Sequence, residues 1–269
     1  MITERTCGKT GLRLAAATAE IGFRVAKDRY GALSVLSNAI VGPLPITSTA
    51  AKATPDRRGR YDTLGSTIYL ADSRRCAYAE VLVGFRKDRA AVAKVAESIG
   101  WAVDAYIAQV LEDARTNGVD APWSVSVDWQ MDRSIYEIRM PHSGWWARMD
   151  HPDTLNALEK LAPTVPGMTE VLQVLTAGSI SSEDRAVTTI LAEIIRQQVL
   201  DDGSEPLGIS FPSKTLFGRC WAYWDRRFDA GLPSGSNDLH QLSSQNVGPD
   251  PEFTYVTDYY DLPLLGRHP

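Results

Sequence analysis

Hydrophobic and polar positions along the chain alternate with two periods, and the longer of these predicts helices. The clearest helical spacing follows Ser181, where apolar residues fall on one face of a helix that is expected to end near 201–203. That face comprises Val187, Ile190, Leu191, Ile194 and Ile195. Further helices are expected over 1–20, from about 73 to 86, over 89–117 with a break at Gly100, over 154–161 and over 170–175.

Runs that are rich in β-branched and aromatic residues, or that alternate between apolar and polar residues, predict strands. The segment 229–251 is rich in Gly, Pro, Ser and Asn, so it is predicted to be a loop. Strands and helices are mixed without the regular alternation of a doubly wound parallel sheet, and the expected fold class is therefore α+β. The predicted strands are 21–25, 66–71, 124–129, 135–140, 207–211, 219–224 and 253–258.

The 269 residues contain no repeat and no clear linker, so one domain is expected over 1–269. Its core is expected at about 21–228, interrupted by a helical insertion at about 89–117. A loop-rich C-terminal tail is expected over 229–269.

Composition and charge argue against some classes of function. The chain is 44% hydrophobic and 23% charged, as is ordinary for a globular protein. A formal net charge of −5 argues against binding to nucleic acid or to an anionic membrane. No run of about 18 apolar residues is present. The short apolar stretch 12–19 is expected to be helical and not a signal peptide, so a cytoplasmic protein is expected.

The cysteines and histidines show no ligand pattern. Cys7, Cys76 and Cys220 are scattered and odd in number, which is not the pattern of a disulfide framework or of paired metal ligands. The four histidines also lack the spacing of metal ligands. No metal site is therefore expected.

Two arginines are candidates for binding phosphate. Arg60 follows Gly59, which permits a tight turn, and it belongs with Arg57 and Arg58 to the densest basic cluster of the chain. Because guanidinium groups match phosphate oxygens with two hydrogen bonds, Arg60 is either a phosphate ligand or part of a solvated loop. Arg24, on another predicted strand, is a candidate for the same role, with a plain surface arginine as the alternative.

Three further side chains complete a set that suits a phosphorylated ligand. Glu80 lies in a predicted helix among small residues, so its carboxylate forms either a structural ion pair or an electrostatic anchor in a pocket. Tyr69, on a predicted strand, is either a core tyrosine or a ring that lines a nucleotide pocket. Ser213 follows a predicted strand without the pattern of a nucleophile elbow, so it either caps the backbone or donates a hydrogen bond to a ligand.

In their order along the chain, these residues and their neighbours resemble the RES-domain family, which is named for its arginine, glutamate and serine. The resemblance covers about 21–228. The arginine motif of the family often reads Gly-Gly-Arg-Trp-Asn, whereas this chain has Arg58-Gly59-Arg60-Tyr61-Asp62. The matching segments are Gly22-Phe23-Arg24-Val25, Gly59-Arg60-Tyr61-Asp62, Thr67-Ile68-Tyr69-Leu70-Ala71-Asp72-Ser73, Ala79-Glu80-Val81-Leu82, Asp184-Arg185-Ala186-Val187-Thr188, Gly208-Ile209-Ser210-Phe211-Pro212-Ser213 and Arg219-Cys220-Trp221-Ala222.

The resemblance implies an ADP-ribosyltransferase-like fold and NAD as the substrate, with no metal and no further cofactor. Well-known members are toxins of bacterial toxin–antitoxin pairs that degrade NAD by hydrolysis or phosphorolysis, and a protein antitoxin masks their site. The expected partners are then NAD, inorganic phosphate and a cognate antitoxin, with neither nucleic acid nor a membrane. Two alternatives stay open: transfer of ADP-ribose to a protein, and a nucleotide-binding module without catalysis.

The resemblance also implies roles for the candidate residues. Breaking the nicotinamide–ribose bond develops positive charge on the sugar, which an ionised Glu80 is expected to stabilise. Arg24 and Arg60 are expected to hold the phosphates of the ligand. Tyr69 is expected to orient the ribose or nicotinamide, Ser213 to bind the amide or sugar, and Tyr61 to contact the substrate.

Overall fold

The structure is a computed structural model, and it describes residues 3–34, 59–63, 65–162, 175–182 and 184–265. The helix predicted over 170–175 and the basic residues Arg57 and Arg58 lie almost wholly outside these ranges.

Among the described residues, nine strands form one mixed sheet in the order β1-β2-β6-β7-β8-β4-β3-β5-β9. Neighbouring strands are antiparallel, except that β6 and β7 are parallel. The strands are β1 (Glu4–Thr6), β2 (Arg13–Ala16), β3 (Ile21–Lys27), β4 (Thr67–Ala71), β5 (Arg133–Arg139), β6 (Trp145–Arg148), β7 (Gly208–Pro212), β8 (Arg219–Trp224) and β9 (His240–Asn246).

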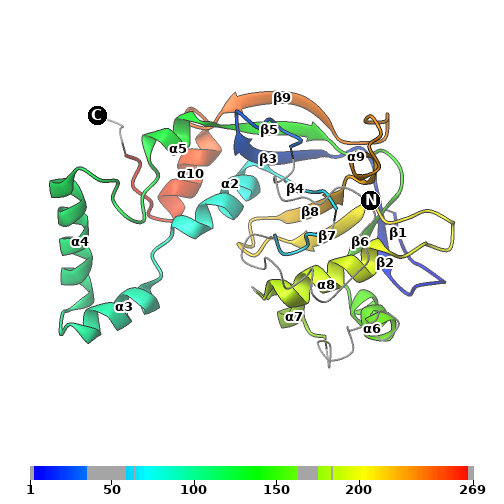
Figure 1. The fold of residues 1–269 in the computed structure, drawn as a ribbon, viewed down its shortest axis with the longest axis horizontal. Helices are drawn as coiled ribbons and strands as arrows, with labels where there is room; N and C mark the ends of the chain where they lie inside the picture. Colours follow the sequence, from blue (N-terminus) through cyan, green and yellow to red (C-terminus); the bar gives the residue numbers. More distant parts are fainter. Residues whose placement is uncertain (1–2, 35–58, 64, 163–174, 183, 266–269) are drawn as a thin grey trace.

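Two groups of helices pack against this sheet, and a third group projects away from it (Figure 1). Helices α2 and α10 pack on each other next to β3 and β4, while α6, α7 and α8 gather beside β7. Helices α3 and α4 form an arm that extends away from the sheet. The helices are α2 (Arg74–Leu82), the 3₁₀ turn η2 (Val83–Phe85), α3 (Arg89–Ser98), α4 (Val103–Asn117), α5 (Val127–Met131), α6 (Pro152–Leu161), α7 (Ala177–Ser181), α8 (Arg185–Arg196), α9 (Arg226–Asp229) and α10 (Pro251–Tyr259).

Alternation along the central strands buries both faces of the sheet. On β4, Ile68 and Leu70 join one hydrophobic cluster, while Tyr69 and Ala71 face the other. The side chains of strand β8 alternate between the two clusters in the same way, and Cys220 lies on the same side of the sheet as Tyr69. Because successive side chains of a strand point to opposite faces, this register brings Tyr69 and Cys220 to the face that α2 covers.

Several predicted elements are confirmed. Strand β8 has the predicted bounds, and β3, β4, β5 and β7 lie where strands are expected. The helical insertion is present with its break, since Gly100 separates α3 from α4 and Gly118 ends α4 in the left-handed conformation. Helix α2 begins after Ser73, whose hydroxyl accepts a hydrogen bond from the Cys76 N–H. The mixture of strands and helices is compatible with the α+β class.

The helix predicted over 1–20 is wrong. The segment forms the antiparallel pair β1 and β2, joined by a turn in which Gly11 has a φ of 76°. Strand β2 in turn pairs with β6, a strand that was not predicted. Strands of three or four residues are too short to show a period of two, so here pairing across the sheet decided the conformation.

Two segments predicted as strands, 124–129 and 253–258, contain helices. Helix α5 begins after Ser126, which accepts a hydrogen bond from the Trp129 N–H at 3.2 Å. Helix α10 begins after Asp250, whose carboxylate accepts from the Glu252 N–H, and Pro251 occupies its first turn. In both cases a capping side chain outweighed the strand propensity of the apolar residues that follow.

The loop predicted over 229–251 contains an edge strand, β9, which pairs with β5. Most of its side chains are polar and its central residues are exposed, so no apolar alternation marks it in the sequence. No helix among the described residues is long and apolar enough to cross a bilayer.

Candidate functional site

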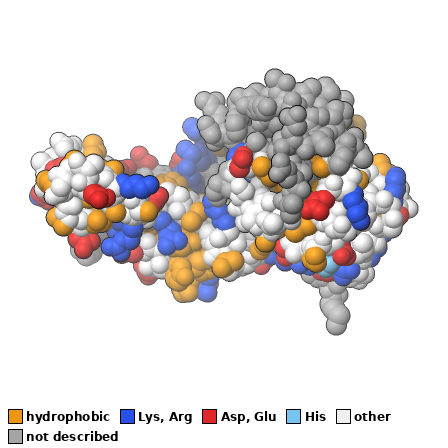
Figure 2. Space-filling model, turned by 90° about the horizontal axis from the view of Figure 1, so that it is seen from below, with side chains coloured by type: hydrophobic (Ala, Val, Ile, Leu, Met, Phe, Trp, Pro, Cys, Tyr) orange, Lys and Arg blue, Asp and Glu red, His pale blue; other side chains and the backbone are white. Residues whose placement is uncertain are grey.

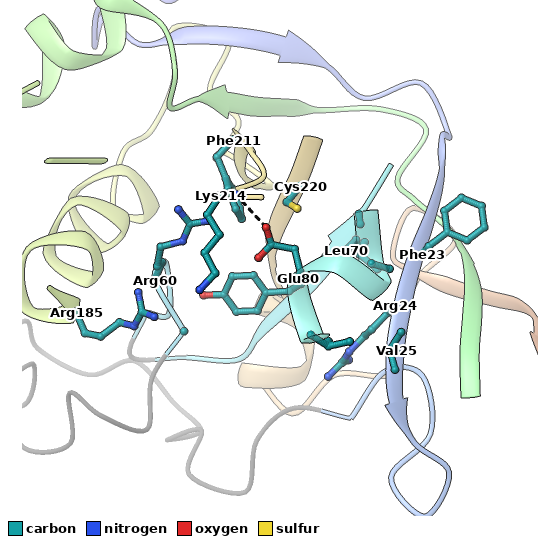
Figure 3. Close-up of a pocket in the computed structure, with 15 residues that line it drawn as sticks. Phe23, Arg24, Val25, Arg60, Leu70, Glu80, Arg185, Phe211, Lys214 and Cys220 are labelled. Carbon is teal, nitrogen blue, oxygen red and sulfur yellow. Dashed lines mark hydrogen bonds between the residues drawn. The ribbon is translucent and has the colours of Figure 1, made fainter. Parts of the chain in front are cut away.

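A cavity of about 250 Å³ lies between the face of the sheet that carries Tyr69 and the end of α2 (Figure 3). Strands β3, β4, β7 and β8, the turn at 59–60 and the N-terminus of α8 all contribute to its wall. The polar residues that line it are Arg24, Arg60, Tyr69, Glu80, Arg185 and Lys214.

The carboxylate of Glu80 is held at the centre of this cavity. Glu80 lies in the last turn of α2 and is half-buried. Its Oε1 accepts one hydrogen bond from the Ser213 hydroxyl and another from the Lys214 N–H at 3.0 Å. No described residue donates a hydrogen bond to Oε2. The loop after β7 therefore fixes the orientation of the carboxylate through one oxygen and leaves the other for a ligand.

Ser213 is bound to Glu80 and stands behind it. The side chain is 1% exposed and does not line the cavity. Its Oγ lies 2.6 Å from the hydroxyl of Thr215 and accepts a hydrogen bond from the Thr215 N–H. The structure thus brings Ser213 and Glu80 together, as the ordered motifs led us to expect, but it gives Ser213 the position of a support for the carboxylate.

Arg60 is a buried cation, and no described carboxylate forms a salt bridge with it. The residue is 7% exposed, and its guanidinium lies 5.1 Å from the ring centroid of Phe211 and 5.6 Å from that of Tyr61. A buried charge costs several kcal/mol unless it is compensated, and cation–π contacts offset only part of this, about 0.5–2 kcal/mol each. An anion in the cavity beside Arg60 would compensate this charge.

Tyr69 presents its ring to the cavity and uses its hydroxyl elsewhere. The hydroxyl donates to Asp62 Oδ1 at 2.8 Å and accepts from the Tyr61 N–H at 2.9 Å. Burial, together with the nearby Asp62 carboxylate, raises the pKa of Tyr69 well above its ordinary value. A Cβ on Gly59 would lie 2.4 Å from the Tyr69 hydroxyl, so only glycine permits this close approach. Tyr69 therefore anchors the turn that carries Arg60.

Tyr61 is not brought to the cavity wall. Its side chain is 1% exposed, packs on Phe211, and donates its hydroxyl to the carbonyl of Ile180. Burial raises the pKa of Tyr61 to about 12. In this structure the residue contributes to the core beneath Arg60 and has no surface facing the cavity.

Arg24 lines the cavity on the opposite side of Glu80 from Arg60 (Figure 3). Its guanidinium donates hydrogen bonds to the carbonyls of Ala32 at 2.7 Å and Ser34 at 3.0 Å. Burial lowers the pKa of Arg24. These bonds engage two of its five N–H donors, so Arg24 holds the 32–34 backbone and can still present the remaining donors to a ligand.

Two cations at this site, Arg185 and Lys214, were not singled out from the sequence. Arg185 is the first residue of α8, and Lys214 directly follows Ser213. Both lie on the same side of the cavity as Arg60 in Figure 3. Arg185 lies in the segment 184–188 that carries part of the family resemblance, and Lys214 directly follows Ser213, so both positions offered a signal, but their place at the cavity depends on where α8 and the loop after β7 pack.

The charged side chains are distributed unevenly around the cavity. One side of the cavity carries the cations Arg60, Arg185 and Lys214, and the carboxylate of Glu80 stands between them and Arg24. Such a site suits a ligand that has anionic groups and a centre of positive charge within a few ångströms of them. Within the described part of the chain, no three His, Cys, Asp or Glu side chains gather as metal ligands would.

Comparisons of the chain with models of known protein families, with curated proteins and with solved structures give no match in any of the three.

Proposed function

We propose that this protein is an NAD-consuming enzyme of the RES type, with an ADP-ribosyltransferase-like fold, that cleaves the bond between nicotinamide and ribose. The observation that carries this proposal is the pairing of two unusual side chains at one cavity. Arg60 is a buried cation without a salt bridge to any described carboxylate, and Glu80 is a carboxylate at the same cavity that is held by hydrogen bonds from Ser213 and Lys214. A dinucleotide supplies both the anion and the electrophilic sugar that such a pair would recognise.

In the proposed reaction the glycosidic C–N bond of NAD breaks, and its electron pair moves to the nicotinamide nitrogen. Nicotinamide leaves as a neutral molecule, and the ribose carbon develops oxocarbenium-like charge. An oxygen of water or of inorganic phosphate then bonds to that carbon and loses its proton to solvent. The products are nicotinamide and either ADP-ribose or its phosphate ester.

Each described side chain has a task in this scheme. The free Oε2 of Glu80 faces the developing charge and stabilises it through a preorganised field. Arg60, together with Arg185 and Lys214, binds the diphosphate, since guanidinium and ammonium groups are strong donors to phosphate oxygens. Tyr69 offers its ring as a surface for the sugar or nicotinamide. Ser213 keeps the carboxylate in place.

The physiological setting belongs to the same proposal. By its resemblance to the RES-domain family, the protein acts in the cytoplasm as the toxin of a toxin–antitoxin pair, and a cognate antitoxin covers its site. Because the cell depends on NAD, uncontrolled turnover would arrest growth, which gives such a partner its purpose.

The test is to incubate the purified, folded and partner-free chain with NAD, with and without inorganic phosphate, and to follow release of nicotinamide. We expect release in at least one of the two buffers. Binding of NAD without turnover in either buffer would instead indicate a non-catalytic module. Transfer of label from NAD to a protein, without free ADP-ribose or its phosphate, would indicate an ADP-ribosyltransferase.

A further inference from the structure

Thr215 contacts Ser213, which in turn contacts Glu80, and all three belong to one series of hydrogen bonds. Thr215 lies in the loop 213–218 that joins β7 to β8. Its side chain is half-buried and does not line the cavity. Its hydroxyl lies 2.6 Å from Ser213 Oγ, and its N–H donates to the same oxygen at 3.1 Å. Two groups of one residue thus converge on the serine that holds the carboxylate.

The proton and lone pairs of the Ser213 hydroxyl fix the direction of its contact with Thr215. A hydroxyl has one proton to donate and two lone pairs that accept. Under the proposed function Glu80 is ionised, and an ionised carboxylate can only accept, so the Ser213 proton goes to Glu80 Oε1. The two lone pairs of Ser213 then accept from the N–H and from the hydroxyl of Thr215. If Thr215 pointed its proton elsewhere, two lone pairs would face each other across 2.6 Å.

The loop that carries Thr215 is held both at its base and near its tip. At the base, the Ser213 N–H donates to the carbonyl of Gly218 at 2.9 Å. Near the tip, the ring of Phe217 packs edge-on against Tyr259 of α10, with ring centroids 5.1 Å apart. The Thr215 side chain is therefore held in position by the fold itself, as a group that orients a catalytic carboxylate must be.

We propose that Thr215 is a positioning residue of the reaction, whose hydroxyl donates to Ser213 and so commits the single Ser213 proton to Glu80. A hydroxyl that accepts a hydrogen bond is polarised and becomes a better donor in its turn. Thr215 consequently strengthens the hold on Glu80 Oε1 without touching the substrate. This role rests on the function proposed above.

The first test removes the hydroxyl and keeps the shape of the side chain. Thr215→Val should lower kcat for nicotinamide release about 3–5-fold, with KM unchanged because the residue does not line the cavity. Thr215→Ser keeps the hydroxyl and should recover most of the loss. A wild-type kcat in Thr215→Val, or a loss that Thr215→Ser does not recover, would overturn the proposal.

The matched control is Thr116→Val on α4. Helix α4 belongs to the arm that forms the lobe at the left of Figure 2 and extends away from the sheet in Figure 1. The Thr116 hydroxyl also donates to a carboxylate, that of Glu112 at 3.4 Å. Its removal should leave kcat at the wild-type value, so that an effect of Thr215→Val is assigned to its place beside Ser213.

The second test measures the coupling between Thr215 and Ser213. In a chain that already carries Ser213→Ala, Thr215→Val should lower kcat no further, because the hydroxyl to which Thr215 donates is gone. A residue that only maintains the shape of the loop would instead lower kcat equally in both backgrounds. That additive result would show that Thr215 does not act through Ser213, and the assignment would be wrong.

Amide hydrogen exchange, followed by NMR, separates failure of this proposal from failure of the proposed function. The Lys214 N–H donates to Glu80 Oε1 at 3.0 Å, so its exchange rate reports how firmly the carboxylate is held, whether or not NAD is turned over. Thr215→Val should speed this exchange about threefold or more, and Thr116→Val should not change it. A wild-type chain that releases no nicotinamide refutes the proposed function, whereas an unchanged Lys214 exchange rate in Thr215→Val refutes the role of Thr215.

Discussion

The cavity beside Glu80 and the α3–α4 arm depart from the usual distribution of side chains in opposite directions. In the cavity a charged residue is buried, since Arg60 is 7% exposed, whereas on the arm an apolar residue is exposed, since Trp101 is 45% exposed. Each arrangement is costly in isolation, the first through desolvation and the second through contact with water. A buried cation beside a cavity suits an anionic ligand, whereas the exposed apolar residues of the arm are left uncovered by the described part of the chain.

The two regions also differ in how they hold their side chains. Glu80 and Ser213 are held by a hydrogen bond between residues 133 positions apart, whereas Tyr69 donates to Asp62, seven positions away. The arm is built from local helices joined through Gly100, and its charged pair Arg115–Glu112 lies within one turn. Substitutions in the cavity should therefore change chemistry, and substitutions at exposed positions of the arm should leave it unchanged.

The largest effect is expected from Glu80→Gln. Removing the carboxylate charge removes the stabilisation of positive charge on the ribose, so kcat for nicotinamide release should fall about 10²–10³-fold. Glu97→Gln, at an exposed position on α3, is the control and should keep the wild-type kcat. Near wild-type turnover by the Glu80 variant would remove that residue from its proposed role.

A second comparison concerns stability. Leu191 on α8 is fully buried, so Leu191→Ala should lower the free energy of unfolding by about 2–5 kcal/mol through lost contacts and a cavity. Val119, at the end of the arm, is 62% exposed, and Val119→Ala should change the free energy of unfolding by no more than about 0.5 kcal/mol. Chemical denaturation measures both. Equal losses would mean that the arm is packed as tightly as the sheet and α8.

Arg60→Met should weaken catalysis and strengthen the fold. Losing a charged donor to phosphate should lower kcat/KM about 10–100-fold, while replacing a buried cation that has no salt bridge to a described carboxylate with an apolar side chain should raise the melting temperature. Arg139→Met, at an exposed position on β5, should change neither quantity. A melting temperature that falls with Arg60→Met would show that Arg60 is a structural residue.

The smallest of these effects is expected from Ser213→Ala. Ser213 contacts Glu80 and does not line the cavity, so its loss should lower kcat about tenfold by freeing the carboxylate, with KM little changed. Ser213→Thr keeps the hydroxyl and should recover part of the loss, and Ser98→Ala on the arm is the silent control. A rise in KM at constant kcat would instead make Ser213 a ligand-binding residue.

Much of the secondary structure could be predicted from the sequence. The apolar stripe of α8, the strand β8 and the break between α3 and α4 follow from hydrophobic period and from glycine. The exceptions have specific causes. The edge strand β9 is polar, β1 and β2 are too short to show a period, and α10 depends on the Asp250 cap and Pro251, whose signal was outweighed by the apolar residues after them.

The sequence by itself identified the candidate residues of the site. An arginine after glycine (Arg60), a carboxylate in a helix of small residues (Glu80) and a serine after a strand (Ser213) are unusual in combination. Tertiary structure alone decided their relations. In the folded chain the hydroxyls of Ser213 and Tyr69 donate hydrogen bonds to carboxylates, and Tyr61 is buried in the core. Arg185 and Lys214 line the cavity. The physical reason is that period and propensity act over a few residues, whereas the distance between two side chains on different elements depends on how the whole sheet and its helices pack.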